Sequence, residues 1–153
     1  MSASPSSACP PVTVLMSVYN GARFLNEALD SIRSQTFRDF EFLIIDDGSA
    51  DATPAILARH AASDARIRIV TQENRGLIPS LNRGFAEARG EFIARMDADD
   101  VSRPYRLAAQ MQFLSSRSDI VLVGGAIEVI DEEGGAWRTI RLPEKPEQVR
   151  RHM

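Results

Sequence analysis

Three aspartates stand close together after an apolar stretch: Asp97, Asp99 and Asp100 follow the run Phe92–Met96. On an extended segment, carboxylates two positions apart point to the same side, so Asp97 and Asp99 can face one ligand. Carboxylates this close repel each other, and a divalent cation such as Mg²⁺ or Mn²⁺ relieves the repulsion, often together with substrate phosphates. The cluster therefore predicts binding of a metal and a diphosphate. The alternative is a solvated acidic turn before the next helix.

A second acidic pair, Asp46 and Asp47, ends another apolar run and is followed by Gly48 and Ser49. A carboxylate here can accept hydrogen bonds from a nucleobase or a ribose, and Gly48 allows a close backbone approach. A turn closed by an aspartate side chain is the alternative. Two acidic loops in one chain favour nucleotide binding more strongly than either loop alone.

The third candidate segment, Tyr19–Gly21, follows the first apolar run. Tyr19 could stack on a base or pack as a half-buried ring. The chain has no G-x-G-x-x-G motif after this run and no G-x-x-x-x-G-K-[ST] motif anywhere. We therefore do not expect a glycine-rich helix start to hold the phosphates.

The elements that must position these residues are indicated by apolar runs that alternate with amphipathic stretches. Buried strands are predicted at Val12–Val18, Phe40–Asp46, Ile67–Thr71 and Phe92–Met96. Helices are predicted at Arg23–Gln35, at Pro54–Ala62 with Thr53 as a cap, at Leu77–Arg89 with Gly90 as a stop, and at Pro104–Ser115.

The last third of the chain has a different pattern, with short strands predicted at Ile120–Val123, Ile127–Ile130 and Trp137–Leu142. A Gly134-Gly135 turn should join the latter two as a hairpin. The strand–helix alternation before them predicts an α/β fold with a mostly parallel sheet flanked by helices. Ligands bind such sheets at the carboxyl ends of the strands, which selects the loops at 19–22, 46–51 and 97–100.

Composition limits the alternatives. The chain has 153 residues, 44% of them hydrophobic, and a net charge of −3, which fits one globular domain and gives no basic surface for nucleic acid. Residues 1–11 are rich in Ser and Pro, and we expect a disordered leader there and a domain over 12–153. The single cysteine, Cys9, and the lack of any apolar run near the ~20 residues of a membrane span favour a cytoplasmic protein, free or at the inner face of a membrane.

Four motifs in this order resemble the family 2 glycosyltransferases, which have the GT-A fold. They are S-V-Y-N-G at Ser17–Gly21, S-Q-T-F with F-E-F-L-I-I-D-D-G-S over Ser34–Ser49, N-R-G at Asn74–Gly76, and G-E-F-I-A-R-M-D-A-D-D at Gly90–Asp100. The resemblance implies transfer of a sugar, with inversion, from a nucleoside-diphosphate sugar to a hydroxyl of a glycan or lipid-linked acceptor, as in polysaccharide biosynthesis.

The resemblance also implies roles for particular residues. Ser17 and Tyr19 match positions that contact the nucleotide base, and Asp47, supported by Asp46, matches the carboxylate that reads it. Asp97 matches the residue on the ribose and diphosphate side, and Asp99 the ligand of Mn²⁺ or Mg²⁺, with Asp97 beside it.

The family places its catalytic base well downstream of the D-x-D motif, and the carboxylates Glu128, Asp131 and Glu132 match no family motif. We therefore expect a donor-binding part, truncated at its C-terminal end, that is either a transferase or a non-catalytic module binding nucleotide sugars. Its open sheet edge would favour self-association or a partner chain. A phosphatase of the haloacid dehalogenase type, suggested by Asp97–Val101, needs its aspartate nucleophile after an early strand and a lysine later in the chain. The only lysine that follows is Lys145, which argues against this class.

Overall fold

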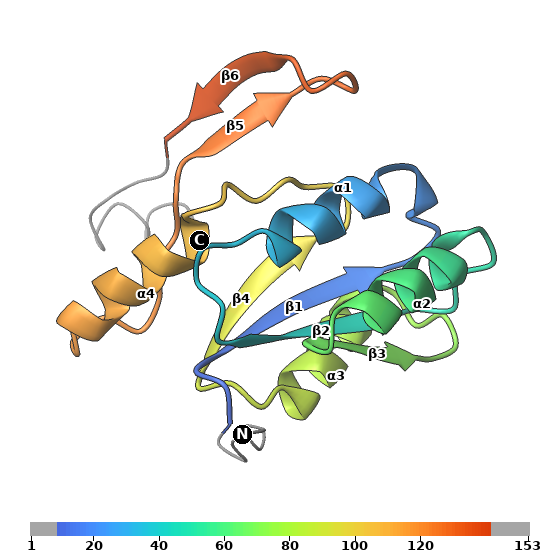
Figure 1. Cartoon of the computed structure of the whole chain (residues 1–153), viewed down its shortest axis with the longest axis horizontal. Helices are drawn as coiled ribbons and strands as arrows, with labels where there is room; N and C mark the ends of the chain where they lie inside the picture. Colours follow the sequence, from blue (N-terminus) through green and yellow to red (C-terminus); the bar gives the residue numbers. More distant parts are fainter. Residues whose placement is uncertain (1–8, 142–153) are drawn as a thin grey trace, which may run out of the picture. The chain divides into compact units, whose positions relative to one another are not determined.

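The structure, a computed structural model, describes residues 9–141 (Figure 1). The chain forms two compact units, one ending at Ala108 and the other beginning at Ala109. The first unit holds the strands β1 (Val12–Val18), β2 (Phe40–Asp46), β3 (Ile67–Thr71) and β4 (Phe92–Asp97) and the helices α1 (Ala22–Arg33), α2 (Thr53–Ser63) and α3 (Leu77–Glu87). Helix α4 (Arg106–Ser116) begins in the first unit and continues into the second, which also holds β5 (Ile127–Ile130) and β6 (Ala136–Ile140).

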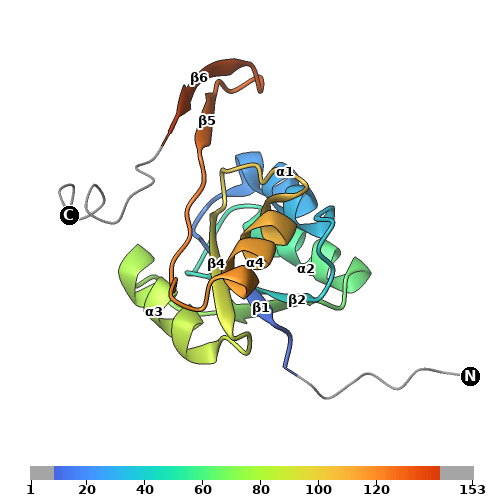
Figure 2. The ribbon, with the colours of Figure 1, turned by 90° about the vertical axis from the view of Figure 1, so that its left-hand side faces the viewer.

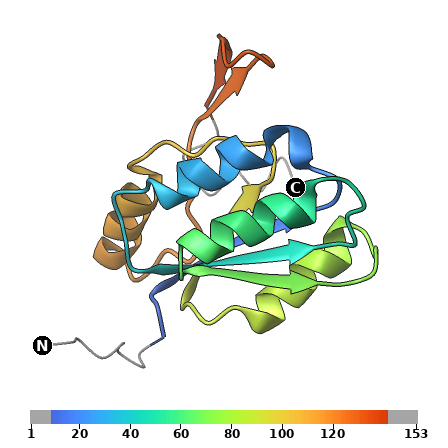
Figure 3. The ribbon, with the colours of Figure 1, turned by 45° about the vertical axis from the view of Figure 1, so that its right-hand side comes forward.

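The four strands of the first unit are all parallel, in the order β3-β2-β1-β4. Helices α1 and α2 cover one face of this sheet and α3 covers the other, as Figures 2 and 3 show from two sides. Because both faces are covered, β2 is buried at every position and β1 at nearly every position, which explains why their sequences are mostly apolar. The predicted α/β fold with a mostly parallel sheet is confirmed.

The strand order reverses direction at β1. The chain steps from β1 to β2 to β3, and β4 then returns to the other side of β1. The ends of the strands are level, because Ser17 pairs with Asp97 and Val18 with Asp46. The three loops selected from the sequence therefore leave the same edge of the sheet, and two of them flank the point of reversal.

Three strands, β1, β2 and β3, have the predicted bounds, and the helices shift by a few residues at their ends. Thr53 is not a cap but the first residue of α2, and its Oγ1 accepts a hydrogen bond from Gly21 N at 3.0 Å. Gly90 does not end α3 directly; a Cβ at this position would lie 2.4 Å from Thr13 N, so the glycine is needed for close packing on β1.

In the second unit, β5 and β6 form the predicted antiparallel hairpin. Its turn is closed by Asp131, whose carboxylate accepts a hydrogen bond from Gly135 N, while Gly134 has a φ of +84°. The strand predicted at 120–123 is wrong: this segment is in no strand, and Val121 is 91% exposed, so its β-branched residues have no sheet to join.

Most of the predicted leader and the end of the chain from residue 142, including Leu142 of the last predicted strand, lie outside the described residues. Within residues 9–141, no helix combines the length and the apolar character needed to cross a membrane.

Candidate functional site

A cavity of about 440 Å³ lies at the point of strand reversal, between the ends of β1 and β4. A volume of this size is in the ordinary range for small-molecule sites. Its walls come from the end of β1, the β1–α1 loop, the first residues of α1, the last residue of β4 and the loop after it: Ser17, Val18, Tyr19, Asn20, Gly21, Arg23, Phe24, Asp97, Ala98 and Asp99.

Two carboxylates face this cavity. Asp97, the last residue of β4, pairs with Arg95, and the exposed Asp99 follows two positions later. Asp100 does not line the cavity; burial, together with the negative charges of Asp97 and Asp99, raises the pKa of its carboxyl. Asp97 and Asp99 therefore line the same cavity, and their joint binding of one ligand stays a prediction.

The side chains at the cavity can supply only part of the ligands that a hard cation needs. Among residues 9–141, no three or more His, Cys, Asp and Glu side chains lie close enough to hold a metal by themselves. Proteins usually bind Mg²⁺ through one or two carboxylates, and oxygens of the substrate phosphates complete its coordination. The residues present are therefore suited to a metal that arrives with a diphosphate.

Asn20 joins the β1–α1 loop to the β2–α2 loop. Its φ of 50° is left-handed, a conformation in which Asn is one of the less strained residues. Its Oδ1 accepts hydrogen bonds from Ala50 N at 2.9 Å and Asp51 N at 3.4 Å, and its own N–H donates to Ser49 Oγ at 2.9 Å. The bonds hold the loop that carries the exposed ring of Tyr19.

The acidic pair after β2 does not line the cavity, although both residues lie at the same edge of the sheet. Both are 2% exposed. Asp47 accepts hydrogen bonds from Gln72 Nε2 at 2.6 Å, Arg75 N at 3.0 Å and Gly76 N at 2.8 Å. Burial raises the pKa of Asp47, but these hydrogen bonds outweigh it and leave the pKa below the usual value of 3.8.

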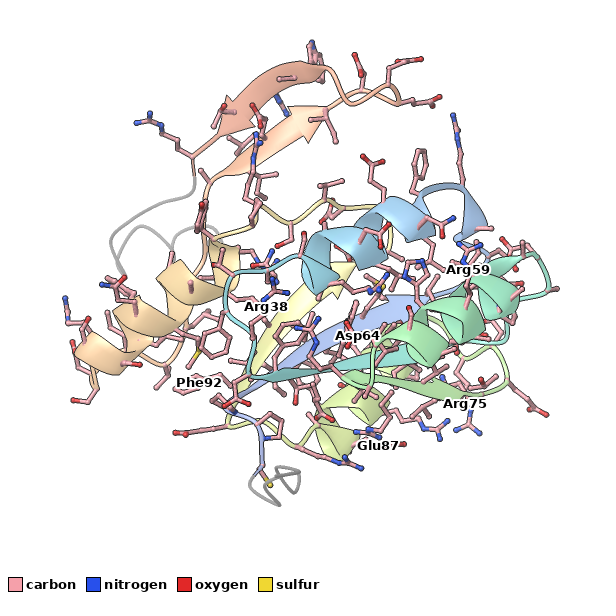
Figure 4. All side chains as sticks on the ribbon, in the orientation of Figure 1. Arg38, Arg59, Asp64, Arg75, Glu87 and Phe92 are labelled. Carbon is pink, nitrogen blue, oxygen red and sulfur yellow. The ribbon has the colours of Figure 1, made fainter. Side chains whose placement is uncertain are left out.

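The segment held by Asp47 also packs closely against the β2–α2 loop. Gly48 has a φ of +80°, and a Cβ there would lie 2.9 Å from Asn74 N. Only glycine fits this position without strain. In Figure 4, the labelled Arg75 lies at the end of the sheet toward which the strands point, and Phe92, the first residue of β4, lies at the opposite end.

Arg106 was not found from the sequence. Its Nη1 lies 3.5 Å from Arg95 O and 3.7 Å from Met96 Sδ, while its Nε and Nη2 are buried without a hydrogen-bond partner in the described part of the chain. Burial lowers the pKa of Arg106 and the charge of Asp100 raises it. The sequence offered one signal for Arg106: it is a cationic residue at the start of a predicted helix, nine positions after Asp97.

Comparison with known proteins agrees with this geometry. The family model described as glycosyl transferase family 2 matches residues 13–153. EpsE of Bacillus subtilis, named as a glycosyltransferase, is 40% identical over 140 residues, covering 90% of this chain and 50% of EpsE. EpsH of the same organism, also named as a glycosyltransferase, is 38% identical over 122 residues, covering 80% of this chain and 36% of EpsH. The chain thus spans half or less of these relatives.

Among solved structures, a mannosyltransferase from Pyrobaculum calidifontis, described in complex with GDP-Man and Mn²⁺, superposes with a TM-score of 0.65 at 28% identity. The match covers 81% of this chain and 36% of the mannosyltransferase. The parallel sheet, the flanking helices and the small hairpin are those of the GT-A fold. The chain belongs to glycosyl transferase family 2.

Proposed function

We propose that the chain is the donor-binding part of an inverting glycosyltransferase that takes a nucleoside-diphosphate sugar. In such a reaction an acceptor hydroxyl attacks the anomeric carbon from the side opposite the diphosphate. The bond from that carbon to the diphosphate oxygen breaks, and the hydroxyl proton passes to a carboxylate base.

The observation that carries the proposal is the pair of carboxylates, Asp97 and Asp99, at one wall of a cavity at the strand reversal. A diphosphate is an anion, and two bare carboxylates would repel it, so a cation between them is required. Asp99 is the proposed ligand of Mn²⁺ or Mg²⁺, with Asp97 as the second carboxylate and the contact for the ribose and diphosphate. When bound, the metal would offset the charge that develops on the leaving diphosphate.

The end of β1 and the loop after it supply two of the proposed nucleoside contacts. The Tyr19 side chain is 53% exposed at the cavity and offers a ring on which a base can stack, next to the half-buried Ser17. Asp47, with Asp46 beside it, is the proposed reader of the base. Three N–H donors already bind Asp47, so a carboxylate with about four acceptor sites can take one more at most.

We propose no catalytic base among the residues that line the cavity. The two carboxylates of the cavity, Asp97 and Asp99, are already assigned to the metal and the diphosphate. The second candidate function is therefore binding of a nucleotide sugar without transfer by this chain, which the same observation favours. Release of nucleoside diphosphate that depends on an acceptor would decide for the transferase. A glycan or a lipid-linked hydroxyl is the proposed acceptor class.

A melting-temperature panel tests the donor proposal. The chain is heated with UDP-sugars and GDP-sugars, each with Mn²⁺ and with a chelator, and nucleoside monophosphates serve as controls that lack the second phosphate. Binding to the folded state raises the melting temperature by mass action, so at least one nucleoside-diphosphate sugar should raise it with Mn²⁺ and much less without. No rise for any donor in the presence of metal would contradict the proposal.

A further inference from the structure

Gln35, just after the end of α1, is completely buried and lies at the centre of a hydrogen-bond network with the chain after the D-x-D motif. Its Nε2 is within hydrogen-bond distance of Ser31 O at 3.1 Å, Ser102 Oγ at 3.1 Å and Arg103 O at 2.8 Å. Its Oε1 accepts a hydrogen bond from Leu107 N at 3.1 Å. One amide side chain thus contacts both ends of the segment 102–107.

Neighbouring groups hold the same segment. Ser102 N donates to the buried Ser31 Oγ at 3.0 Å, and Thr36 N donates to Pro104 O at 2.9 Å. Buried polar networks in which every group is paired fix one geometry, because a displaced partner would leave an unsatisfied group in the interior. The segment is therefore fixed to the end of α1.

The loop that carries the proposed metal ligand Asp99, residues 98–101, lies between this fixed segment and the sheet. On one side Asp97 pairs with Ser17 in the β1–β4 ladder, and on the other the network of Gln35 begins at Ser102. Between them the exposed Asp99 and Asp100 side chains accept no hydrogen bond from the described residues. The position of Asp99 thus depends on how the two ends of a short loop are held.

We infer that Gln35 is a positioning residue for the metal site: by fixing the segment after the D-x-D motif, it sets where the Asp99 carboxylate stands relative to Asp97. This inference rests on the proposed function, since it takes Asp99 as the metal ligand. It requires no contact between Gln35 and the metal. Residues that orient metal ligands from behind typically change metal affinity about 10–100-fold when they are replaced.

Gln35→Met tests the inference, because Met is similar in size and unbranched but cannot make these hydrogen bonds. The matched control is Thr13→Val at the opposite end of the sheet. Thr13 is also completely buried, and its Oγ1 donates to Glu41 at 2.7 Å and accepts from Gly90 N at 2.8 Å. Both variants should melt at a lower temperature, but only Gln35→Met should raise the Mn²⁺ concentration needed for half-maximal binding of a nucleoside diphosphate, by about tenfold or more.

Ser102→Ala is the milder variant if Gln35→Met fails to fold. It removes one acceptor of Gln35 and leaves the backbone bonds in place, and it should raise the Mn²⁺ requirement by a smaller factor. An unchanged Mn²⁺ requirement in the folded variants, or an equal rise in Thr13→Val, would overturn the inference, since the loss would then be one of general stability.

Amide hydrogen exchange separates this inference from the proposed function, because it needs no ligand. Gln35→Met should speed exchange at Leu107 and across residues 98–103 relative to the parent chain and to Thr13→Val. Unchanged exchange there would overturn the inference whatever the chain binds. If instead the parent chain binds no nucleoside diphosphate with Mn²⁺, the proposed function fails, and the role of Gln35 at a metal site fails with it even where exchange responds.

Discussion

At the scale of single residues, Asp99 combines full access to the cavity with no structural role in the described part of the chain. Asp99→Asn should therefore leave the melting temperature within about 1 °C and remove most of the Mn²⁺-dependent binding of nucleoside diphosphates, because a neutral amide is a poor ligand for a hard cation. Titration calorimetry with and without Mn²⁺ measures this. Asp39→Asn, which removes an exposed charge just before the amino end of β2, is the matched control and should bind like the parent.

Asp47 differs from Asp99 because it is buried and already accepts three hydrogen bonds. Asp47→Ala should destabilise the chain by roughly 1–3 kcal/mol, since it leaves N–H groups of the β3–α3 segment without an acceptor. We also expect nucleoside diphosphate affinity to fall about tenfold. Urea unfolding and calorimetry measure the two effects; an affinity equal to that of the parent would contradict the role in reading the base.

The lowered pKa of Asp47 has a definite pH consequence. A carboxyl whose pKa is lower in the folded state than in the unfolded state stabilises the fold above its unfolded pKa, near 3.8, and loses this contribution as the pH falls through the folded pKa. The destabilisation caused by Asp47→Ala should therefore be largest at neutral pH and shrink in strong acid. An equal difference between the variant and the parent at pH 7 and pH 3 would contradict it.

At the scale of elements, His60 connects α2 to α1. It is 5% exposed; its Nε2 lies 3.2 Å from Asn26 Oδ1 and its Nδ1 lies 3.2 Å from Arg33 Nη1. A neutral ring with its proton on Nε2 satisfies both contacts. Burial lowers the pKa of His60; the charge of Asp30 opposes this, while those of Arg33 and Arg59 add to it.

Because the pKa of His60 is lower in the folded state than its usual 6.5, the unfolded chain binds the proton more readily. The free energy of unfolding should thus fall as the pH drops below about 6.5, and His60→Gln should show less of this fall while keeping a polar contact with Asn26. Denaturant melts at pH 7.5 and 5.5 measure the difference. A parallel loss of stability in parent and variant would assign the acid sensitivity to other groups.

The sequence predicted correctly those strands that are apolar along most of their length. Strands β1, β2 and β3 were found with the correct bounds because a parallel strand covered on both faces must be apolar along most of its length. The segment at 120–123 has the same residue types, but whether such a run joins a sheet depends on a partner that the sequence does not reveal. The spacing of Asp97 and Asp99 alone predicted that they lie on one side, and both line the cavity. Gln35 was missed because its partners lie far along the chain.

At the scale of the whole molecule, we expect this chain to bind its donor but to transfer the sugar poorly. The loops that line the cavity are present, but a base within hydrogen-bond reach of the acceptor is worth ~10²–10⁴ in rate, and positioning of the acceptor contributes further. A coupled assay for released nucleoside diphosphate, with donors tested alone and with sugar or lipid acceptors, should detect at most slow hydrolysis. Acceptor-stimulated turnover near ~1 s⁻¹ or faster would show that the base lies within these residues.

The strand order has a consequence for how the molecule is assembled. β1 emerges first and can pair with β2 early, but its other edge stays open until β4 arrives, after β2, β3 and three helices. Pairings between distant parts of a chain form late, and an open edge attracts other chains in the meantime. Because the cavity has β1 on one side and β4 on the other, it is completed only when this last strand docks. A ligand that binds the cavity would therefore stabilise the four-stranded sheet relative to its three-stranded precursor.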